Sequence, residues 1–492
     1  MTDHILPANI TAFLARQHKL LIGGEWVDGS DSPIDVVDPA TGESISSIAN
    51  AAQTDVDAAV VAARVAFDSP GWREQKPNER GRMINRIADL LEQHTEELAY
   101  LETLDNGKPF SISKAVDVGA AVGAFRYYAG WADKIHGQTH NISMPGDFHA
   151  YTLREPVGVA ALIVPWNYPL VMAAMKLGPA LAAGCACILK PAEDTSLTAI
   201  RLGELMQEAG VPDGIINIVT GYGHTAGAAL AAHEDVDKVA FTGSTATGKA
   251  IVTAAAGNLK KLTLELGGKS PCIIMPDADL EQAIPAATMA VMFNSGQTCT
   301  ATTRLYAHEK IYDQVIAGVT EVAKNVKVGP GFAEDSVLGP LVSAKQLARV
   351  QAFLATGKDE GDEIVCGGEQ LGDTGYFFQP TVINARSEQS TLIREEIFGP
   401  VITAQRFGDI DEVIALANAS SYGLSSSVWT QNLSHAHKLA KSLSTGQVGV
   451  NTAAVADWDL PIGGYKQSGW GRENGFDAVA NYLQTKAVAM SI

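Results

Sequence analysis

Cys299 is the residue with the clearest capacity for covalent chemistry in this sequence. It directly follows Phe293–Thr298, a polar stretch of small residues after an apolar, helix-like segment. A thiol in such a loop is accessible, and its thiolate is a strong nucleophile. The other cysteines stand in apolar or strand-like surroundings, where packing is the expected role and a metal-binding Cys-x-Cys pair is the weaker alternative. They are Cys185, Cys187, Cys272 and Cys366.

Glu265 is the candidate general base. It stands between Leu264 and Leu266 at the end of a strand-like run, just before Gly267. Burial among apolar side chains raises the pKa of a carboxyl group toward the range that suits a base at neutral pH. A strand residue that faces solvent or pairs with a lysine is the alternative interpretation. The eleven histidines form no HExxH motif and no Cys/His cluster with zinc spacing, so we expect no metal site.

Two glycine-containing turns are candidates for anion binding. Gly221–Gly227 reads GxGxxxG, one residue longer than the dinucleotide fingerprint, and is weak evidence alone. Gly243–Ala250 nearly spells a phosphate-binding loop, but Ala250 lacks the hydroxyl that would hold Mg²⁺. That loss argues against an NTPase or kinase. What remains is Ser244 at a helix N-terminus, where free N–H groups favour a pyrophosphate, with a purely structural turn as the alternative.

Short β-branched runs alternate with helical patterns around these turns. We expect strands at Val157–Val164, Cys187–Leu189, Ile215–Val219 and Val236–Phe241. This alternation predicts a parallel sheet covered by helices, which binds ligands at the carboxyl ends of its strands. Residues 157–175 are uncharged over 19 positions, but prolines interrupt them, so a strand, a turn and a buried helix are expected rather than a membrane span.

Length, charge and cysteine content limit the class of protein. A chain of 492 residues predicts two or three domains, and a second α/β domain is expected from about residue 266. The net charge of −19 argues against nucleic acid and anionic membranes as partners. Five cysteines are too few for a disulfide framework, and the first twenty residues resemble neither a secretory signal nor a transit peptide. We therefore expect a cytoplasmic protein.

Seven segments, taken together, resemble the signatures of the aldehyde dehydrogenase superfamily. Their order and spacing agree with the family from about residue 20 almost to the C-terminus. The seven segments are PWNYPL (165–170), KPAE (190–193), FTGSTATG (241–248), LELGGKSP (264–271), FNSGQTCTA (293–301), EEIFGPV (395–401) and GGYKQSGWGRENG (463–475).

The resemblance implies an α/β fold in three parts. A Rossmann-like nicotinamide-binding domain would comprise residues 1–129 and 152–265, and an α/β catalytic domain residues 266–467. Residues 130–151 and 468–492 would form a small β oligomerisation element, in a homodimer or homotetramer. Independently of the resemblance, His136–Tyr151 is expected to form an exposed hairpin and Ala487–Ile492 a terminal strand, and both could pair across subunits.

The resemblance also implies the reaction. Cys299 would attack an aldehyde, the resulting thiohemiacetal would lose hydride to NAD, and water activated by Glu265 would hydrolyse the thioester to a carboxylic acid. Asn167 would stabilise the oxyanion, and Lys176 and Glu473 would relay the proton behind the base. The implied cofactor-binding residues are Val164, Pro165, Trp166, Lys190, Glu193, Gly223, Gly227, Phe241, Gly243, Ser244, Glu265, Leu266, Gly267, Glu396 and Phe398. A carboxylate at Glu193 would repel a 2′-phosphate, which favours NAD over NADP, although mixed use stays open.

The substrate is less well determined by the sequence. Tyr168, Met172, Met175 and Trp458 match substrate-tunnel positions, with ordinary helix packing as the alternative for the first three. Met175 replaces a tryptophan of many members, and Asp457–Ile462 replaces their aromatic segment, so the pocket is expected to differ. No arginine aligns with the tunnel, which favours a neutral aliphatic or aromatic aldehyde. A CoA-dependent reaction would not need Glu265, and a non-catalytic member would be expected to lack Cys299 or Glu265.

Overall fold

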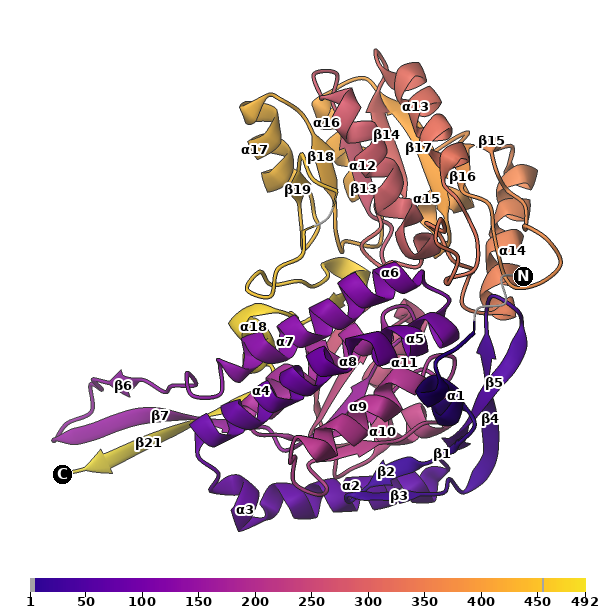
Figure 1. The fold of residues 1–492 in the computed structure, drawn as a ribbon. Helices are drawn as coiled ribbons and strands as arrows, with labels where there is room; N and C mark the ends of the chain where they lie inside the picture. The colour runs from indigo at the N-terminus through magenta and orange to yellow at the C-terminus, as the bar shows by residue number, and fades with distance from the viewer. Residues whose placement is uncertain (1–4, 454) are drawn as a thin grey trace.

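Two lobes, each built on its own mainly parallel sheet, and a projecting β-ribbon make up the computed structural model (Figure 1). The structure describes residues 5–453 and 455–492. The first lobe, at the bottom of Figure 1, contains most of the first 270 residues. The second lobe, at the top, contains most of the remainder. The predicted α/β class with alternating strands and helices is therefore confirmed.

The first sheet has eight strands within the described residues, in the order β20-β12-β11-β8-β9-β10-β2-β3. The five central strands are parallel, and β2, β3 and β20 run antiparallel to their neighbours. The strand order reverses at β8, which lies between β9 and β11, so ligand-binding residues are expected at the carboxyl ends of these three strands. The bounds are β2 (Leu20–Ile22), β3 (Glu25–Val27), β8 (Val159–Ile163), β9 (Ala186–Lys190), β10 (Ile216–Ile218), β11 (Lys238–Thr242), β12 (Lys261–Glu265) and β20 (Gly469–Trp470).

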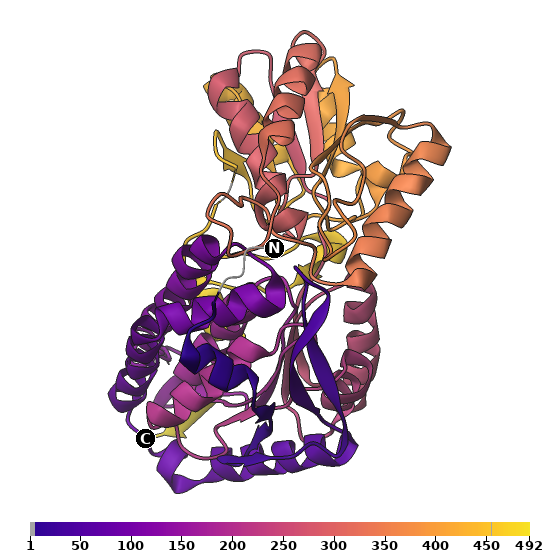
Figure 2. The ribbon, with the colours of Figure 1, turned by 45° about the vertical axis from the view of Figure 1, so that its right-hand side comes forward.

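Helices cover both faces of this sheet (Figures 1 and 2). The apolar segment that raised the membrane question forms β8 and the buried helix α8 (Pro169–Ala183), as predicted. No helix in residues 5–453 or 455–492 combines the length and the apolar character that a membrane span requires. The other helices of this lobe are α1 (Ala8–Leu14), α2 (Gln53–Asp68), α3 (Pro70–Arg73), α4 (Pro77–Gln93), α5 (Thr95–Asn106), α6 (Phe110–Ile112), α7 (Gly119–Ala129), α9 (Leu197–Glu208), α10 (Ala228–Ala232), α11 (Thr245–Ala254) and α18 (Gly475–Ala480).

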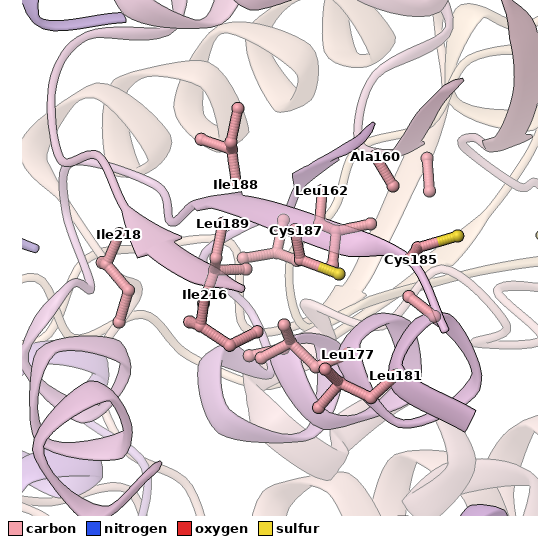
Figure 3. Close-up of a cluster of buried hydrophobic side chains, with 14 of the residues drawn as sticks. Ala160, Leu162, Leu177, Leu181, Cys185, Cys187, Ile188, Leu189, Ile216 and Ile218 are labelled. Carbon is pink, nitrogen blue, oxygen red and sulfur yellow. The ribbon is translucent and has the colours of Figure 1, made fainter. Parts of the chain in front are cut away.

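Cys185 and Cys187 lie in the core of this lobe. Figure 3 shows their sulfur atoms among aliphatic side chains of the sheet and of α8, including Leu162 and Leu177. Burial raises the pKa of the Cys185 thiol to about 11 and that of Cys187 well above its usual range. Both thiols are thus protonated packing groups, as the sequence predicted.

The second sheet has the order β15-β16-β17-β14-β13-β18-β19, and only β15 is antiparallel to its neighbour. Its strands are β13 (Pro271–Ile274), β14 (Arg304–His308), β15 (Glu363–Cys366), β16 (Thr381–Asn384), β17 (Val401–Phe407), β18 (Ser427–Trp429) and β19 (Gly449–Val450). Its helices are α12 (Leu280–Met292), α13 (Tyr312–Asn325), α14 (Ala344–Glu360), α15 (Thr391–Arg394), α16 (Ile410–Asn418) and α17 (Leu433–Ser442). The first strand of this sheet begins at Pro271, close to the expected start of a second α/β unit near residue 266.

The projecting ribbon joins segments from opposite ends of the chain. Strand β7 (Phe148–Pro156) pairs antiparallel with β6 (Thr139–His140) on one side and with β21 (Leu483–Ser491) on the other. The C-terminus lies near the tip of this ribbon (Figure 1). The expected hairpin and terminal strand are therefore present, and they pair with each other within one chain. A smaller sheet, β1-β5-β4, packs beside α1; its strands are β1 (Gln17–His18), β4 (Asp31–Asp38) and β5 (Glu43–Asn50).

Candidate active site

The loop that carries Cys299 has an unusual backbone. It joins α12 to β14, and it begins with three consecutive left-handed residues, Asn294 (φ 51°), Ser295 (φ 54°) and Gly296 (φ 73°). A Cβ atom on Gly296 would overlap the carbonyl oxygen of Gly399, so only glycine fits there. Left-handed non-glycine residues are unfavourable unless their surroundings hold them, and they cluster at functional sites.

Buried amides hold this loop in place. The side chain of Gln297 accepts a hydrogen bond from the Val342 amide (3.0 Å) and donates one to the Asn294 carbonyl (3.1 Å). The hydroxyl of Ser295 donates to the Gly339 carbonyl at 2.7 Å. The backbone that precedes Cys299 is therefore fixed from several sides.

Cys299 is half-buried, whereas the other four cysteines are fully buried. Burial, together with the nearby carboxylates of Glu396 and Glu265, raises the pKa of its thiol to about 12. The most accessible thiol of the chain is therefore the one that the sequence singled out, and it is protonated at neutral pH.

Asn167 lies against the cysteine loop although it belongs to the other lobe. It stands in the turn between β8 and α8, and its side-chain amide donates to the carbonyl of Gln297 at 2.8 Å. In return, the Asn294 side chain donates to the Asn167 carbonyl at 2.9 Å. An amide group carries two N–H donors, and the bond to Gln297 uses one of them. In the described part of the chain, the Asn167 side-chain amide donates to no acceptor besides Gln297.

Glu265 ends strand β12 and approaches the same loop. A Cβ atom on Gly268 would overlap the carbonyl oxygen of Cys299, which shows how closely the glutamate motif packs against the cysteine. Glu265 is buried, and burial, reinforced by the carboxylate of Glu473, raises its pKa well above the usual value. Among the described residues, its Oε1 atom has no hydrogen-bond partner. Such a carboxylate is a competent proton acceptor.

Lys176 and Glu473 form a buried ion pair near Glu265. Lys176 comes from α8 and Glu473 from the loop before α18, and their charged groups are in direct hydrogen-bond contact. The charge of Lys176 lowers the pKa of Glu265, in opposition to burial and Glu473. A cavity with room for about one water molecule adjoins the pair. Its lining consists of Met175, Pro179, Ala240, Thr263, Arg472, Glu473, Ala478, Asn481 and Tyr482.

Several of the predicted cofactor residues of the first lobe lie at the carboxyl ends of β8 and β9. The amide of Val164 donates to the carbonyl of Lys190 at 3.1 Å, which joins the two strand ends. The Lys190 ammonium lies 3.5 Å from the Glu193 carboxylate and donates to the Pro191 carbonyl at 2.8 Å. Glu193 is about one-third exposed (32%), so its carboxylate can accept hydrogen bonds from a ligand.

The two glycine turns adopt different structures. Gly243 and Ser244 connect β11 to α11, and the Ser244 hydroxyl accepts the Thr247 amide at 3.2 Å as the helix N-cap. The Gly223–Gly227 segment forms a π-helical turn instead of a phosphate-binding loop of the usual kind. A Cβ atom on Gly223 would meet no atom within 4 Å, so its outer face is open.

Glu396 and Phe398 of the second lobe contact predicted cofactor residues of the first lobe or their neighbours. The Glu396 carboxylate accepts the Gly268 amide at 2.8 Å, and burial raises the pKa of Glu396 to about 7. A Cβ atom on Gly267 would overlap this carboxylate. Phe398 has a left-handed backbone (φ 61°), and its ring packs edge-on against Trp166 with centroids 5.3 Å apart. The structure therefore brings together predicted cofactor residues of both lobes.

The predicted tunnel residues contact different parts of the structure. The Tyr168 hydroxyl is 2.7 Å from Oγ1 of Thr298, the neighbour of Cys299. Met175 lines the small cavity beside Glu473, and Met172 is half-buried. Trp458 packs over α7, where a Cβ atom on Gly123 would come within 2.6 Å of its ring nitrogen. The tunnel assignment itself stays a prediction.

Sequence reasoning missed the amides that hold the site together. Asn106, at the end of α5, donates to the Trp166 carbonyl at 2.7 Å, and Asn294 and Gln297 act as described above. The Asn106–Gly107 pair at a helix end was a visible signal, but its partner is a backbone carbonyl sixty positions away. In the described part of the chain, no group of three or more His, Cys, Asp or Glu side chains could hold a metal ion.

Comparison with known proteins agrees with this geometry. The model of the aldehyde dehydrogenase family matches residues 26–488. The mitochondrial aldehyde dehydrogenase of Homo sapiens is 48% identical over 96% of this chain and 92% of its own length. An aldehyde dehydrogenase of Alternaria alternata is 47% identical over 100% and 99%. The NAD+ complex of an aldehyde dehydrogenase from Bacillus cereus superimposes with a TM-score of 0.97, 47% identity and 99% coverage of both chains. This chain therefore belongs to the aldehyde dehydrogenase family.

Proposed function

We propose that this enzyme oxidises a neutral aliphatic or aromatic aldehyde to the carboxylic acid, with NAD as hydride acceptor and water as the second substrate. The observation that carries the proposal is the meeting of Cys299, Asn167 and Glu265 from three different segments at one loop. Together they supply a nucleophile, an oxyanion donor and a base, which acyl transfer to water requires.

The residues at the strand ends fit a dinucleotide. The N-terminus of α11 follows Gly243 and Ser244 and offers N–H groups to a pyrophosphate, and the Lys190–Glu193 pair suits a ribose with free hydroxyls. The partly exposed carboxylate of Glu193 would repel a 2′-phosphate, which supports NAD over NADP. The Bacillus cereus structure contains NAD+. When bound, NAD supplies the acceptor for the hydride that leaves the substrate.

The first step belongs to Cys299. Its Sγ atom forms a bond to the aldehyde carbon as the thiol proton passes to solvent, and the electron pair of the carbonyl π bond moves to the oxygen, which becomes an oxyanion. The free N–H of the Asn167 amide and the backbone N–H of Cys299 would stabilise that charge. Removing one donor of this kind typically costs about 2.7–4 kcal/mol of transition-state stabilisation.

The second step belongs to Glu265. Once oxidation has produced a thioester on Cys299, the carboxylate of Glu265 takes a proton from water, and the water oxygen attacks the thioester carbon. The bond to Sγ breaks, which releases the carboxylic acid and leaves the Cys299 thiolate, and solvent then returns a proton to the sulfur. The Lys176–Glu473 pair next to Glu265 would receive the proton and so reset the base.

Transfer to coenzyme A is the alternative fate of the thioester. It would not need an unpaired, buried carboxylate next to the cysteine, so Glu265 supports hydrolysis. An ATP-hydrolysing role finds no support, because Ala250 occupies the position at which the phosphate-loop motif requires a serine or threonine hydroxyl for Mg²⁺.

We further propose a homodimer or homotetramer in the cytoplasm. The ribbon exposes apolar side chains in the loop between β6 and β7 and at the C-terminal end of the chain. They include Met144 (59%), Met490 (48%) and Ile492 (82%). Exposed apolar strands of this kind are typical of surfaces that pair with another chain. A reducing compartment would keep the thiol of Cys299 free.

Cys299→Ala should abolish aldehyde oxidation, because it removes the nucleophile while leaving the carboxyl ends of β8, β9 and β11 unchanged. NADH formation measured by absorbance should fall to background, and NAD binding measured by calorimetry should change by less than about twofold. Cys366→Ala, at a buried thiol of the second sheet, is the matched control and should retain turnover. Wild-type turnover in Cys299→Ala would refute the assignment.

Glu265→Gln should produce a burst of NADH followed by slow turnover. Thioester formation would survive, whereas the amide could not take a proton from water. Rapid-mixing absorbance should show a burst of about one equivalent per active site. If the variant instead shows no burst while it binds NAD and aldehyde normally, Glu265 acts in the first step rather than in hydrolysis.

The pH dependence of thiol reactivity should follow the raised pKa of Cys299. Because this pKa is about 12, the thiolate fraction of the NAD-free enzyme should rise roughly tenfold per pH unit between pH 7 and 9. Alkylation of Cys299 by iodoacetamide, followed by mass spectrometry, should rise in parallel. Glu396→Gln removes a negative charge beside the thiol and should therefore speed alkylation at each pH. A rate that does not change with pH would mean that the thiol is already ionised.

A panel of aldehydes should separate the substrate classes. Linear aliphatic and aromatic aldehydes should give a higher kcat/KM than carboxylated aldehydes, because no arginine aligns with the tunnel. Each assay should run faster with NAD than with NADP, and Glu193→Gln should narrow that difference by removing the charge that repels a 2′-phosphate. Preference for a carboxylated aldehyde would contradict the substrate proposal and leave the reaction class intact.

A further inference from the structure

A fully buried ionic cluster that the mechanism does not use lies behind the cysteine loop. Lys108, which follows α5, places its ammonium 2.5 Å from the Asp117 carboxylate and 3.7 Å from that of Glu102. Asp117 belongs to a π-helical turn (Ser113–Val118) and Glu102 to α5. All three side chains are completely excluded from solvent (0%).

The cluster contains more acid groups than bases. Burial and the neighbouring Asp117 raise the pKa of Glu102 to about 8, and burial raises that of Asp117 as well. A third buried carboxyl, Asp105, accepts the Leu197 amide at 3.0 Å, and its pKa is also raised well above the usual value. Lys108 is the cation that compensates this group. Three buried acids near one base are costly to assemble, which points to a role beyond ordinary packing.

The ammonium of Lys108 also faces an aromatic ring. Its nitrogen lies 4.3 Å from the centroid of the Tyr168 ring, within the range of a cation–π interaction. The hydroxyl of Tyr168 is in turn 2.7 Å from Oγ1 of Thr298. Thr298 immediately precedes Cys299, so a continuous series of contacts links the buried cluster to the thiol.

The backbone next to Lys108 touches the same loop by a second route. Gly107 ends α5 in a left-handed conformation (φ 87°), and a Cβ atom on Gly339 would overlap its carbonyl oxygen. The carbonyl of Gly339 accepts the Ser295 hydroxyl at 2.7 Å. On the other side, Asn106 donates to the Trp166 carbonyl, directly before Asn167. The Asn106–Lys108 segment therefore contacts the supports of both the nucleophile and the oxyanion donor.

We propose that Lys108 is a positioning residue for Cys299, which holds the Tyr168 ring so that its hydroxyl fixes Thr298 and thereby the direction of the thiol. The inference rests on the proposed role of Cys299 as nucleophile. Lys108 itself touches neither substrate nor cofactor in this assignment. The Asp117 carboxylate, which accepts a hydrogen bond from the ammonium, fixes it beneath the ring.

The test compares Lys108→Met with Lys108→Arg. The methionine variant keeps the length of the side chain and loses its charge, and kcat should fall by between about tenfold and a hundredfold, as expected for a misdirected nucleophile. The KM for NAD should stay within about twofold. Arginine keeps the charge and the contact with the ring, so Lys108→Arg should recover most of the lost kcat. Equal kcat values for the wild type and Lys108→Met would overturn the proposal.

Lys260→Met is the matched control for the loss of a buried lysine. Lys260 is buried and donates to the carbonyls of Ala231 (2.8 Å) and His233 (2.7 Å), and it precedes the strand that ends in Glu265. Both methionine variants should lower the melting temperature, but only Lys108→Met should lower kcat. An equal loss of kcat in the two variants would reduce the role of Lys108 to general stability.

Tyr168→Phe keeps the test decisive if Lys108→Met does not fold. Phenylalanine preserves the ring over Lys108 and removes only the hydrogen bond to Thr298, so folding should be retained and kcat should fall several-fold. Thr298→Val removes the other half of that bond, and the double variant should be no slower than the slower single variant. Full kcat in Tyr168→Phe would overturn the proposal, as would fully multiplicative losses in the double variant.

Alkylation separates this inference from the proposed function. The rate at which iodoacetamide modifies Cys299 reports the orientation of the thiol whether or not Cys299 is the nucleophile. Tyr168→Phe and Lys108→Met should change this rate by at least about threefold, whereas Lys260→Met should not. If Cys299→Ala retains turnover, the proposed function fails and the alkylation result still decides the positioning role. If Cys299→Ala is inactive but alkylation and kcat are unchanged in Tyr168→Phe and Lys108→Met, only the positioning role fails.

Discussion

The hydrogen bond between the Asn167 side chain and the Gln297 carbonyl is the contact on which the site depends. It joins a turn of the first lobe to the loop of the second lobe that carries Cys299. That loop contains two left-handed non-glycine residues, which are unfavourable by themselves. The first lobe therefore adds a contact to those by which the second lobe holds this conformation. One bond thus couples the docking of the lobes to the relative placement of Cys299 and Asn167.

The sheet topology explains why Glu265 stands where it does. Strand β12 pairs with β11 along its whole length, and the chain then crosses to the second lobe at Gly267 and Gly268. The last residue of the strand is consequently the last one that the first sheet holds rigidly. A carboxylate at that position is fixed by the ladder of β11 and β12, yet it lies beside the loop of the opposite lobe. The two glycines permit the close approach of Glu396 and of the Cys299 carbonyl, which any side chain would prevent.

The sequence indicated the strands, the buried helix α8 and the chemically distinctive residues. Cys299 and Glu265 were recognisable because a thiol among small polar residues and a carboxylate between leucines contradict their local pattern. Asn106 and Gln297 were not, because their partners are backbone carbonyls and amides whose proximity only the folded chain creates. The pairing of β7 with β21 was missed for a related reason. The alternation of residues along a strand indicates which side chains share a face. It carries little information about which distant strand will pair with it.

The electrostatics of the site favour a protonated thiol between turnovers. Glu265, Glu396 and Glu473 all raise the pKa of Cys299, in the same direction as burial. The thiolate is the form that both attacks carbonyls and undergoes oxidation. A pKa near 12 therefore limits oxidative damage in the resting enzyme, but it requires that the proton leave as the bond to the substrate forms. Glu265, with its own raised pKa and an unpaired oxygen, raises the pKa of the resting thiol and is suited to accept a proton from water in the proposed hydrolysis, so one carboxylate would both restrain the nucleophile and complete its turnover.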